Sequence, residues 1–221
     1  MAVAPDADAV AHSRGRTLYN KCIFCHGKDA DGDKKQNAPS LRVQEDWYIV
    51  RQLQKFKAGV RGVDPKDIGG VQMRPRAMEL SEEDMHLVAD YIVSSNKGRL
   101  RMPPKTVDGD VAHGKSLYSV CVACHGEDGR GNELLNAPPL VGQHDWYLVQ
   151  QLMNFREGFR GADPNDTTGV VMKPMAMTLA DDQAVADVAA YITTLSARSP
   201  AASPPASAGT TPAAEWDPSR R

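Results

Sequence analysis

Two Cys-x-x-Cys-His motifs contain all four cysteines of this 221-residue chain. In such a motif the two thiols can add across the vinyl groups of haem, and the imidazole that follows is placed to bind the haem iron. No cysteine is left over for a disulfide. The sequence therefore predicts two covalently bound haem c groups. The attaching residues are Cys22, Cys25 with the iron ligand His26, and Cys121, Cys124 with the iron ligand His125.

Two other uses of paired cysteines fit the chain poorly. A zinc ribbon places its two Cys-x-x-Cys units about 15 to 20 residues apart, and these units are much farther apart. A thioredoxin-like thiol pair is expected in a βαβ unit, and the sequence shows no alternating strand pattern. Haem attachment remains the favoured chemistry.

The surroundings of the two motifs repeat with an offset of 99 residues. Ala-Pro-x-Leu follows each motif, then Asp-Trp-Tyr, then Gln-Leu and Phe, and finally a segment of the form Met-x-Pro-x-Ala-Met. A repeat of this length identifies the structural unit before any single motif is interpreted. The chain is therefore expected to contain two domains of the same fold, each with one haem.

The repeat also selects candidates for the second axial ligand of each iron. Of six histidines only His26 and His125 occupy equivalent positions, so a pair of histidines on both irons is not expected. Methionine sulfur is a common alternative and raises the reduction potential. Two methionine pairs are repeated, Met73 with Met172 and Met78 with Met177.

We favour Met73 and Met172 as the ligands. Each is expected in an exposed loop stiffened by a proline two residues later, whereas Met78 and Met177 directly precede the last helix of each domain, where apolar residues usually pack into the core. At this stage the second pair stays open as an alternative.

Other repeated residues have candidate roles around the haems. The carbonyl groups of Pro39 and Pro138 lie at a distance along the chain where they could accept a hydrogen bond from the proximal imidazole and orient it. Trp47, Tyr48, Arg61 and their repeats could contact the haem propionates or could simply pack. The two interpretations are equally supported.

The elements that must position these residues are helices. Each half is predicted as a helix, the haem motif, a long loop, a helix from about residue 47 to 56 (146 to 155 in the second half), the methionine loop and a last helix. The last helix begins near Ser81 and, in the second half, near Asp181. Gly15 and Gly114 should allow the first and last helices to cross closely. The fold class is all-α.

Pro and Gly residues mark the domain boundaries. We expect an N-terminal extension (1–11), a first domain (12–100), an extended linker (101–110), a second domain (111–198) and a tail rich in Pro, Ala and Ser (199–221). The tail should be disordered on its own, or dock on a partner.

The charge balance suggests protein partners rather than nucleic acid. The net charge is −2, but residues 12–104 hold 17 basic against 12 acidic residues, whereas 105–198 hold 7 against 12. Such an asymmetry can orient partners as they approach. No stretch reaches the ~20 apolar residues of a transmembrane helix, and no signal peptide is expected in the given chain.

Taken together, these motifs resemble the dihaem class I cytochromes of the cytochrome c4 type over residues 12–198. The resemblance rests on Cys-x-x-Cys-His-Gly, the Pro-x-Leu turn, the Tyr-x-x-x-Gln-Leu helix and the methionine segment. In that family the ligand methionine lies eight residues before the start of the last helix. Counting back from Ser81 and Ala180 gives Met73 and Met172.

The resemblance implies electron transfer between periplasmic or membrane-bound redox proteins, with His/Met ligation in both domains. Haem attachment to this motif takes place outside the bacterial cytoplasm, so a periplasmic or lumenal location is expected. One alternative is a fixed electron-transfer subunit of a dehydrogenase or terminal oxidase complex. A dihaem redox enzyme is less favoured because the repeated methionine leaves no open iron.

Overall fold

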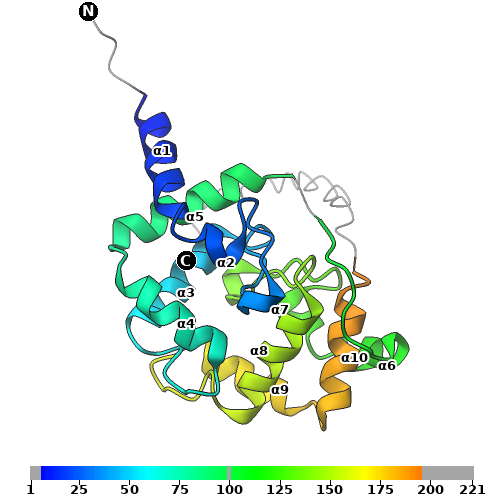
Figure 1. Cartoon of the computed structure of the whole chain (residues 1–221). Coiled ribbons are helices and arrows are strands. Elements are labelled where there is room, and N and C mark those ends of the chain that lie inside the picture. The colour runs from blue at the N-terminus through cyan, green and yellow to red at the C-terminus, as the bar shows by residue number, and fades with distance from the viewer. Residues whose placement is uncertain (1–5, 99–100, 196–221) are drawn as a thin grey trace, which may run out of the picture.

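The computed structural model describes residues 6–98 and 101–195, and these residues form helices and loops. The expected tail (199–221) lies outside the described residues. Within them there is no β-strand, only isolated bridges between Asp33 and Ala38 and between Asn132 and Ala137. The all-α expectation with two similar domains in tandem is confirmed (Figure 1).

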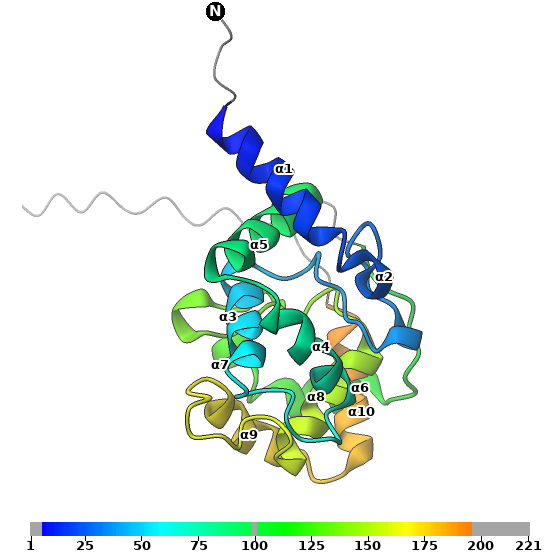
Figure 2. The same ribbon diagram turned by 60° about the vertical axis from the view of Figure 1, so that its left-hand side comes forward.

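The two domains contain the same elements in the same order. The first domain contains α1 (Ala7–Tyr19), α2 (Ile23–His26), the short 3-10 helix η1 (Lys34–Gln36), α3 (Asp46–Lys57), α4 (Ile68–Met78) and α5 (Glu82–Asn96). The second contains α6 (Val111–Tyr118), α7 (Val122–His125), η2 (Glu133–Leu135), α8 (Asp145–Glu157), α9 (Gly169–Met177) and α10 (Asp182–Ile192). In Figure 2, α1 projects from the body at its N-terminal end.

The first and last helices of each domain cross in close contact at a glycine. A Cβ on Gly15 would lie 2.3 Å from the Leu87 carbonyl oxygen, and one on Gly114 would lie 1.9 Å from that of Asp187. Both distances are far below a normal contact, so any side chain here would push the helices apart. This confirms the expected role of both glycines.

Side-chain caps fix where the last helices begin. The Ser81 hydroxyl accepts from the Asp84 amide and the Asp84 carboxylate accepts from the Ser81 amide, a complete capping box. Asp181 caps α10 through the Ala184 amide at 2.8 Å. Both starts agree with the sequence. The buried faces of these helices, including Met85 and Val185, form the two cores.

The methionine segments were expected to be loops, and that expectation was wrong. Met73 lies within helix α4 and Met172 within α9, each helix containing a proline. The Asp67 side chain caps α4 through the Gly70 amide at 3.1 Å, and Ala77 on the same helix is fully buried. Capping and packing therefore outweigh the breaking tendency of Gly and Pro.

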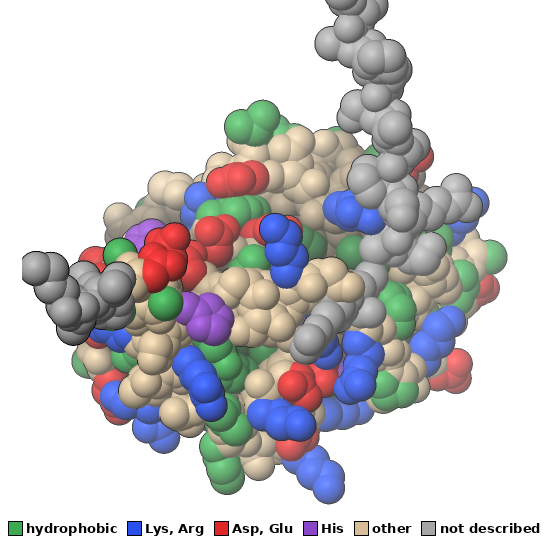
Figure 3. Space-filling view, turned by 90° about the horizontal axis from the view of Figure 1, so that it is seen from above, with side chains coloured by type: hydrophobic (Ala, Val, Ile, Leu, Met, Phe, Trp, Pro, Cys, Tyr) green, Lys and Arg blue, Asp and Glu red, His purple; other side chains and the backbone are tan. Residues whose placement is uncertain are grey.

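Figure 3 shows acidic and basic side chains interspersed over the face seen from above. On this face, therefore, side chains of both signs lie among one another, although the two halves of the sequence have opposite net charges. Here the asymmetry is a difference in total charge rather than a surface of one sign.

Candidate functional site

The two predicted iron ligands of the haem motifs are buried at the ends of short helices. His26 ends α2 and His125 ends α7, and their exposed fractions are 4% and 5%. The Nδ1 atom of His26 donates to the Pro39 carbonyl at 3.0 Å, and that of His125 to the Pro138 carbonyl at 2.9 Å. These bonds hold each ring so that Nε2 is left to bind a metal.

Burial also keeps these imidazoles neutral. It lowers the pKa of both His26 and His125, while the hydrogen bonds to Pro39 and Pro138 act in the opposite direction without cancelling it. Neutral imidazole is the form that ligates a metal. Before attachment, the first cysteine of each motif is a protonated thiol, because burial and the neighbouring cysteine raise the pKa of Cys22 and of Cys121 to about 11.

The two candidate methionine pairs occupy different faces of their helices. Met73 and Met172 are half-buried and line a cavity, whereas Met78 and Met177 are 58% and 59% exposed. The members of each pair are five positions apart in the sequence, which turns them about 140° apart on a helix. The geometry therefore supports Met73 and Met172 as ligands.

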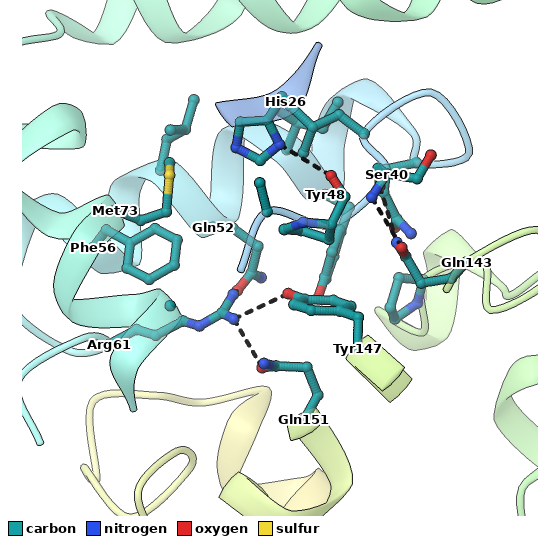
Figure 4. A pocket seen from close by; sticks show the side chains of 18 of the residues that line it. His26, Ser40, Tyr48, Gln52, Phe56, Arg61, Met73, Gln143, Tyr147 and Gln151 are labelled. Atoms are coloured by element: carbon teal, nitrogen blue, oxygen red, sulfur yellow. Dashed lines mark hydrogen bonds between the residues drawn. The ribbon is translucent and has the colours of Figure 1, made fainter. Parts of the chain in front are cut away.

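One cavity connects both predicted haem sites. Its volume is about 500 Å³, within the usual range for cofactor pockets. Residues of both domains line it, so it crosses the domain boundary. In Figure 4 the His26 ring and the Met73 sulfur lie on different sides of the same space. The predicted site residues that line it are Cys22, Cys25, His26, Pro39, Met73, Cys121, His125, Pro138 and Met172.

The lining fits a pair of haems. Around the thiols and ligands it is largely apolar, with residues such as Leu53, Phe56 and Leu148. Arg61 and Arg160 are 4% and 6% exposed, yet the Nε atom of each has no hydrogen-bond partner in the described residues. A buried donor without a partner costs about 1–3 kcal/mol. Haem propionates would supply carboxylates for such donors.

The same two arginines join the domains in a closed ring. Arg61 donates to the Gln52 and Gln151 side-chain oxygens, both at 2.8 Å. Arg160 donates to the same two oxygens, at 2.7 Å to Gln151 and 3.0 Å to Gln52. Each glutamine thus accepts hydrogen bonds from two arginines, one in each domain. Figure 4 shows the part of this arrangement that involves Arg61.

Two tyrosines complete the ring. Arg61 donates to the Tyr147 hydroxyl at 3.2 Å, and Arg160 to that of Tyr48 at 3.1 Å. The sequence left Tyr48 and Arg61 open between propionate contact and packing, and did not assign a role to Gln52 or Gln151. The repeat was the available signal for them, since all members occur twice.

A second contact fastens the loops that follow the haem motifs. The Ser40 amide donates to the Gln143 side-chain oxygen at 3.0 Å, and the Gln143 amide group donates back to the Ser40 carbonyl at 2.9 Å. The Gln44 side chain makes the reciprocal contact with the Pro139 carbonyl at 3.2 Å. The carbonyls that orient the two histidines therefore belong to segments braced against the other domain.

The comparisons with known proteins agree with this geometry. The cytochrome c family profile matches residues 12–96 and again 111–196. The chain belongs to the cytochrome c family. As members of that family, its two domains carry two covalently bound haem c groups, and this dihaem cytochrome transfers electrons.

Individual relatives share the two-domain arrangement. A cytochrome c4 of Azotobacter vinelandii is 30% identical over 83% of this cytochrome and 90% of its own length. A thiosulfate dehydrogenase electron acceptor of Stutzerimonas stutzeri is 33% identical over 77% and 78%. The crystal structure of reduced cytochrome c4 from Pseudomonas stutzeri superposes with a TM-score of 0.64 at 29% identity, over 87% of this cytochrome and all of that chain.

Among residues 6–98 and 101–195, no helix of this cytochrome is both long and apolar enough to cross a membrane.

Proposed function

We propose that this dihaem cytochrome carries electrons between redox proteins of the periplasm, with His26 and Met73 binding the first iron and His125 and Met172 the second. The observation that supports this most directly is the single cavity lined by both motifs and by both methionines. Each haem iron, when bound, accepts and releases one electron.

The side chains of the chain hold and shield the two sites. Cys22 and Cys25 would attach the first haem, and Cys121 and Cys124 the second. The carbonyls of Pro39 and Pro138 orient the imidazoles, which strengthens them as ligands. Phe56 and Leu148, both buried, exclude water from the cavity. A dry site with a thioether ligand favours the reduced iron and therefore a high potential.

Phe24 marks where partners would exchange electrons with the first domain. It lines the cavity and is 80% exposed, so the cavity reaches the surface there. By analogy with the relative named as the acceptor of thiosulfate dehydrogenase, we infer that a dehydrogenase supplies the electrons and that a membrane-bound respiratory complex takes them.

The ligand assignment is tested with alanine variants of the four repeated methionines. In the holoprotein, Met73→Ala and Met172→Ala should each remove half of the sulfur-to-iron absorption band and lower one midpoint potential. Met78→Ala and Met177→Ala are matched controls because they lie on the same helices but face solvent. If the controls remove the band and the first pair does not, the assignment is wrong.

The carrier role is tested by adding carbon monoxide to the reduced holoprotein. Two six-coordinate irons should leave the spectrum unchanged at neutral pH. Rapid binding at either haem would instead indicate an open iron and a catalytic role. If the untreated protein co-purifies in a fixed ratio with a dehydrogenase or oxidase, it is a fixed subunit of that complex rather than a mobile carrier.

A further inference from the structure

The repeat is broken at one buried position between the domains. Asp67 and Asp166 are equivalent by the 99-residue offset, and both are fully buried. Each accepts a backbone amide at the start of its methionine helix, from Gly70 at 3.1 Å and from Gly169 at 2.8 Å. The two carboxylates therefore occupy matching places, one beside α4 and one beside α9.

Their partners across the domain boundary differ in charge. The Lys55 ammonium forms an ion pair with Asp166 and also donates to the Thr168 hydroxyl. At the equivalent position the second domain has Asn154, whose side-chain amide donates to the Asp67 carboxylate at 2.9 Å. The same contact is thus made once by a cation and once by a neutral group.

The arginines and aspartates around this contact are matched by symmetry. Arg61 and Arg160 are repeats of each other, as are Asp67 and Asp166, so Lys55 is the one charge among these five groups that has no mirror image. Its ammonium side chain is only 11% exposed. At such a place a unit charge acts over several ångströms with little solvent screening.

We propose that Lys55 raises the reduction potential of the second haem above that of the first, and so sets the direction in which an electron settles within the molecule. The charge lies beside Thr168, which lines the cavity directly before α9, the helix of Met172. A nearby positive charge stabilises the added electron. Beside α4, the partner of the Asp67 side chain across the boundary is the neutral Asn154 amide, so the first haem has no matching cation to favour its reduction.

This inference rests on the proposed function because it assumes that each haem lies against the methionine helix of its own domain. Its readout is independent of the ligand assignment. Ligation is judged from the sulfur-to-iron band of the methionine variants, whereas Lys55 is judged from two midpoint potentials. Either can fail alone.

The decisive variant exchanges the two residues. Lys55→Asn with Asn154→Lys keeps composition and net charge, and moves the cation from Asp166 to Asp67. Redox titration of wild-type and exchanged holoprotein gives both potentials. The haems are assigned by repeating each titration with a histidine in place of whichever methionine of the first domain, Met73 or Met78, the absorption band identifies as the ligand, because this change lowers the potential of the first haem. We expect the equilibrium distribution of one electron between the haems to change about tenfold toward the first, which is 59 mV.

The single variants separate the two contributions. Lys55→Asn should lower mainly the second potential, and Asn154→Lys should raise mainly the first. Lys55→Asn reuses the amide-to-carboxylate contact that Asn154 already makes with Asp67, so it decides the question if the double exchange does not fold. An unchanged separation in these variants, or a wild-type first haem of higher potential, overturns the proposal.

Discussion

The Tyr48 hydroxyl accepts a hydrogen bond from the Arg160 guanidinium at 3.1 Å, across the boundary between the two domains. Burial acts to raise the pKa of Tyr48, yet the charges of Arg160 and Arg61 outweigh it and the pKa is lowered. The contact is therefore electrostatically strong as well as geometrically matched, and its mirror image joins Tyr147 to Arg61 at 3.2 Å.

A double-mutant cycle should measure this coupling. Residues in one hydrogen-bonded network couple by about 0.5–3 kcal/mol, and we expect a value within that range for Tyr48→Phe with Arg160→Gln. Denaturant unfolding of the holoprotein gives the four free energies. Tyr48→Phe with Arg156→Gln serves as the control, because Arg156 bonds elsewhere, to Asp182 and Glu157. Equal coupling in both cycles would contradict the assignment.

The helix crossings predict a strong effect of a single methyl group. Gly15→Ala and Gly114→Ala should each destabilise their domain by about 3 kcal/mol or more, since the new Cβ meets backbone that cannot move aside. At Gly69, in α4, the nearest atom would lie 3.5 Å away, an ordinary contact. Gly69→Ala should therefore be neutral in the same thermal unfolding measurement, and a comparable loss there would refute the argument.

Asp145 ties the linker to the second domain. It is 1% exposed and accepts from the Thr106 hydroxyl at 2.7 Å and the Val107 amide at 2.8 Å. Hydrogen bonds to a charged group contribute about 1.5–3 kcal/mol. Asp145→Asn should cost that amount at pH 7. Asp46→Asn, at the equivalent but exposed position, should cost much less.

The Asp145 contribution should also depend on pH. Burial acts to raise the pKa of Asp145, but the hydrogen bonds from Thr106, Val107 and Trp146 lower it by more. The pKa therefore lies below its ordinary value of 3.8. A lowered carboxyl pKa stabilises the folded state above the unfolded pKa and loses that effect as pH falls through the folded pKa. Wild type and Asp145→Asn should therefore converge in stability below about pH 4. A constant difference down to pH 2 would exclude this explanation.

Phe24 provides a test of electron exchange at the surface. Phe24→Glu should lower the rate of electron self-exchange between holoprotein molecules about tenfold, equivalent to 1.4 kcal/mol, because like charges meet at the cavity mouth. Nuclear magnetic resonance line broadening measures this rate without a partner. Leu134→Glu adds the same charge at a residue that is 90% exposed and does not line the cavity. A similar decrease in the self-exchange rate for Leu134→Glu would show that electrons are not exchanged specifically at Phe24.

The sequence was sufficient for the parts of the site that depend on local spacing. The motif places His26 beside its cysteines within one helical turn, and the repeat separates Met73 from methionines without a partner. It failed for the conformation around Met73, because Gly69, Gly70 and Pro75 are locally typical of loops. The helix there depends on the Asp67 cap and on the burial of Ala77.

The contacts between the domains were beyond sequence reasoning. Arg61 reaches Gln151 across 90 residues of chain, and Lys55 reaches Asp166 across 111. No periodicity relates residues so far apart unless the docking of the domains is known. The repeat identified Arg61 and Arg160 as equivalent. It did not predict that each arginine would bond to the glutamine of the other domain.

The ring of Arg61, Gln52, Arg160 and Gln151 restricts how the two halves of a duplicated gene can diverge. A substitution in either copy removes a bond from the other, so neither copy can change at these positions independently. Outside the ring the two copies do differ: Phe24 is matched by Ala123 and Lys55 by Asn154. The two copies have therefore diverged in surface residues and in charge, whereas both keep the residues that join the two sites.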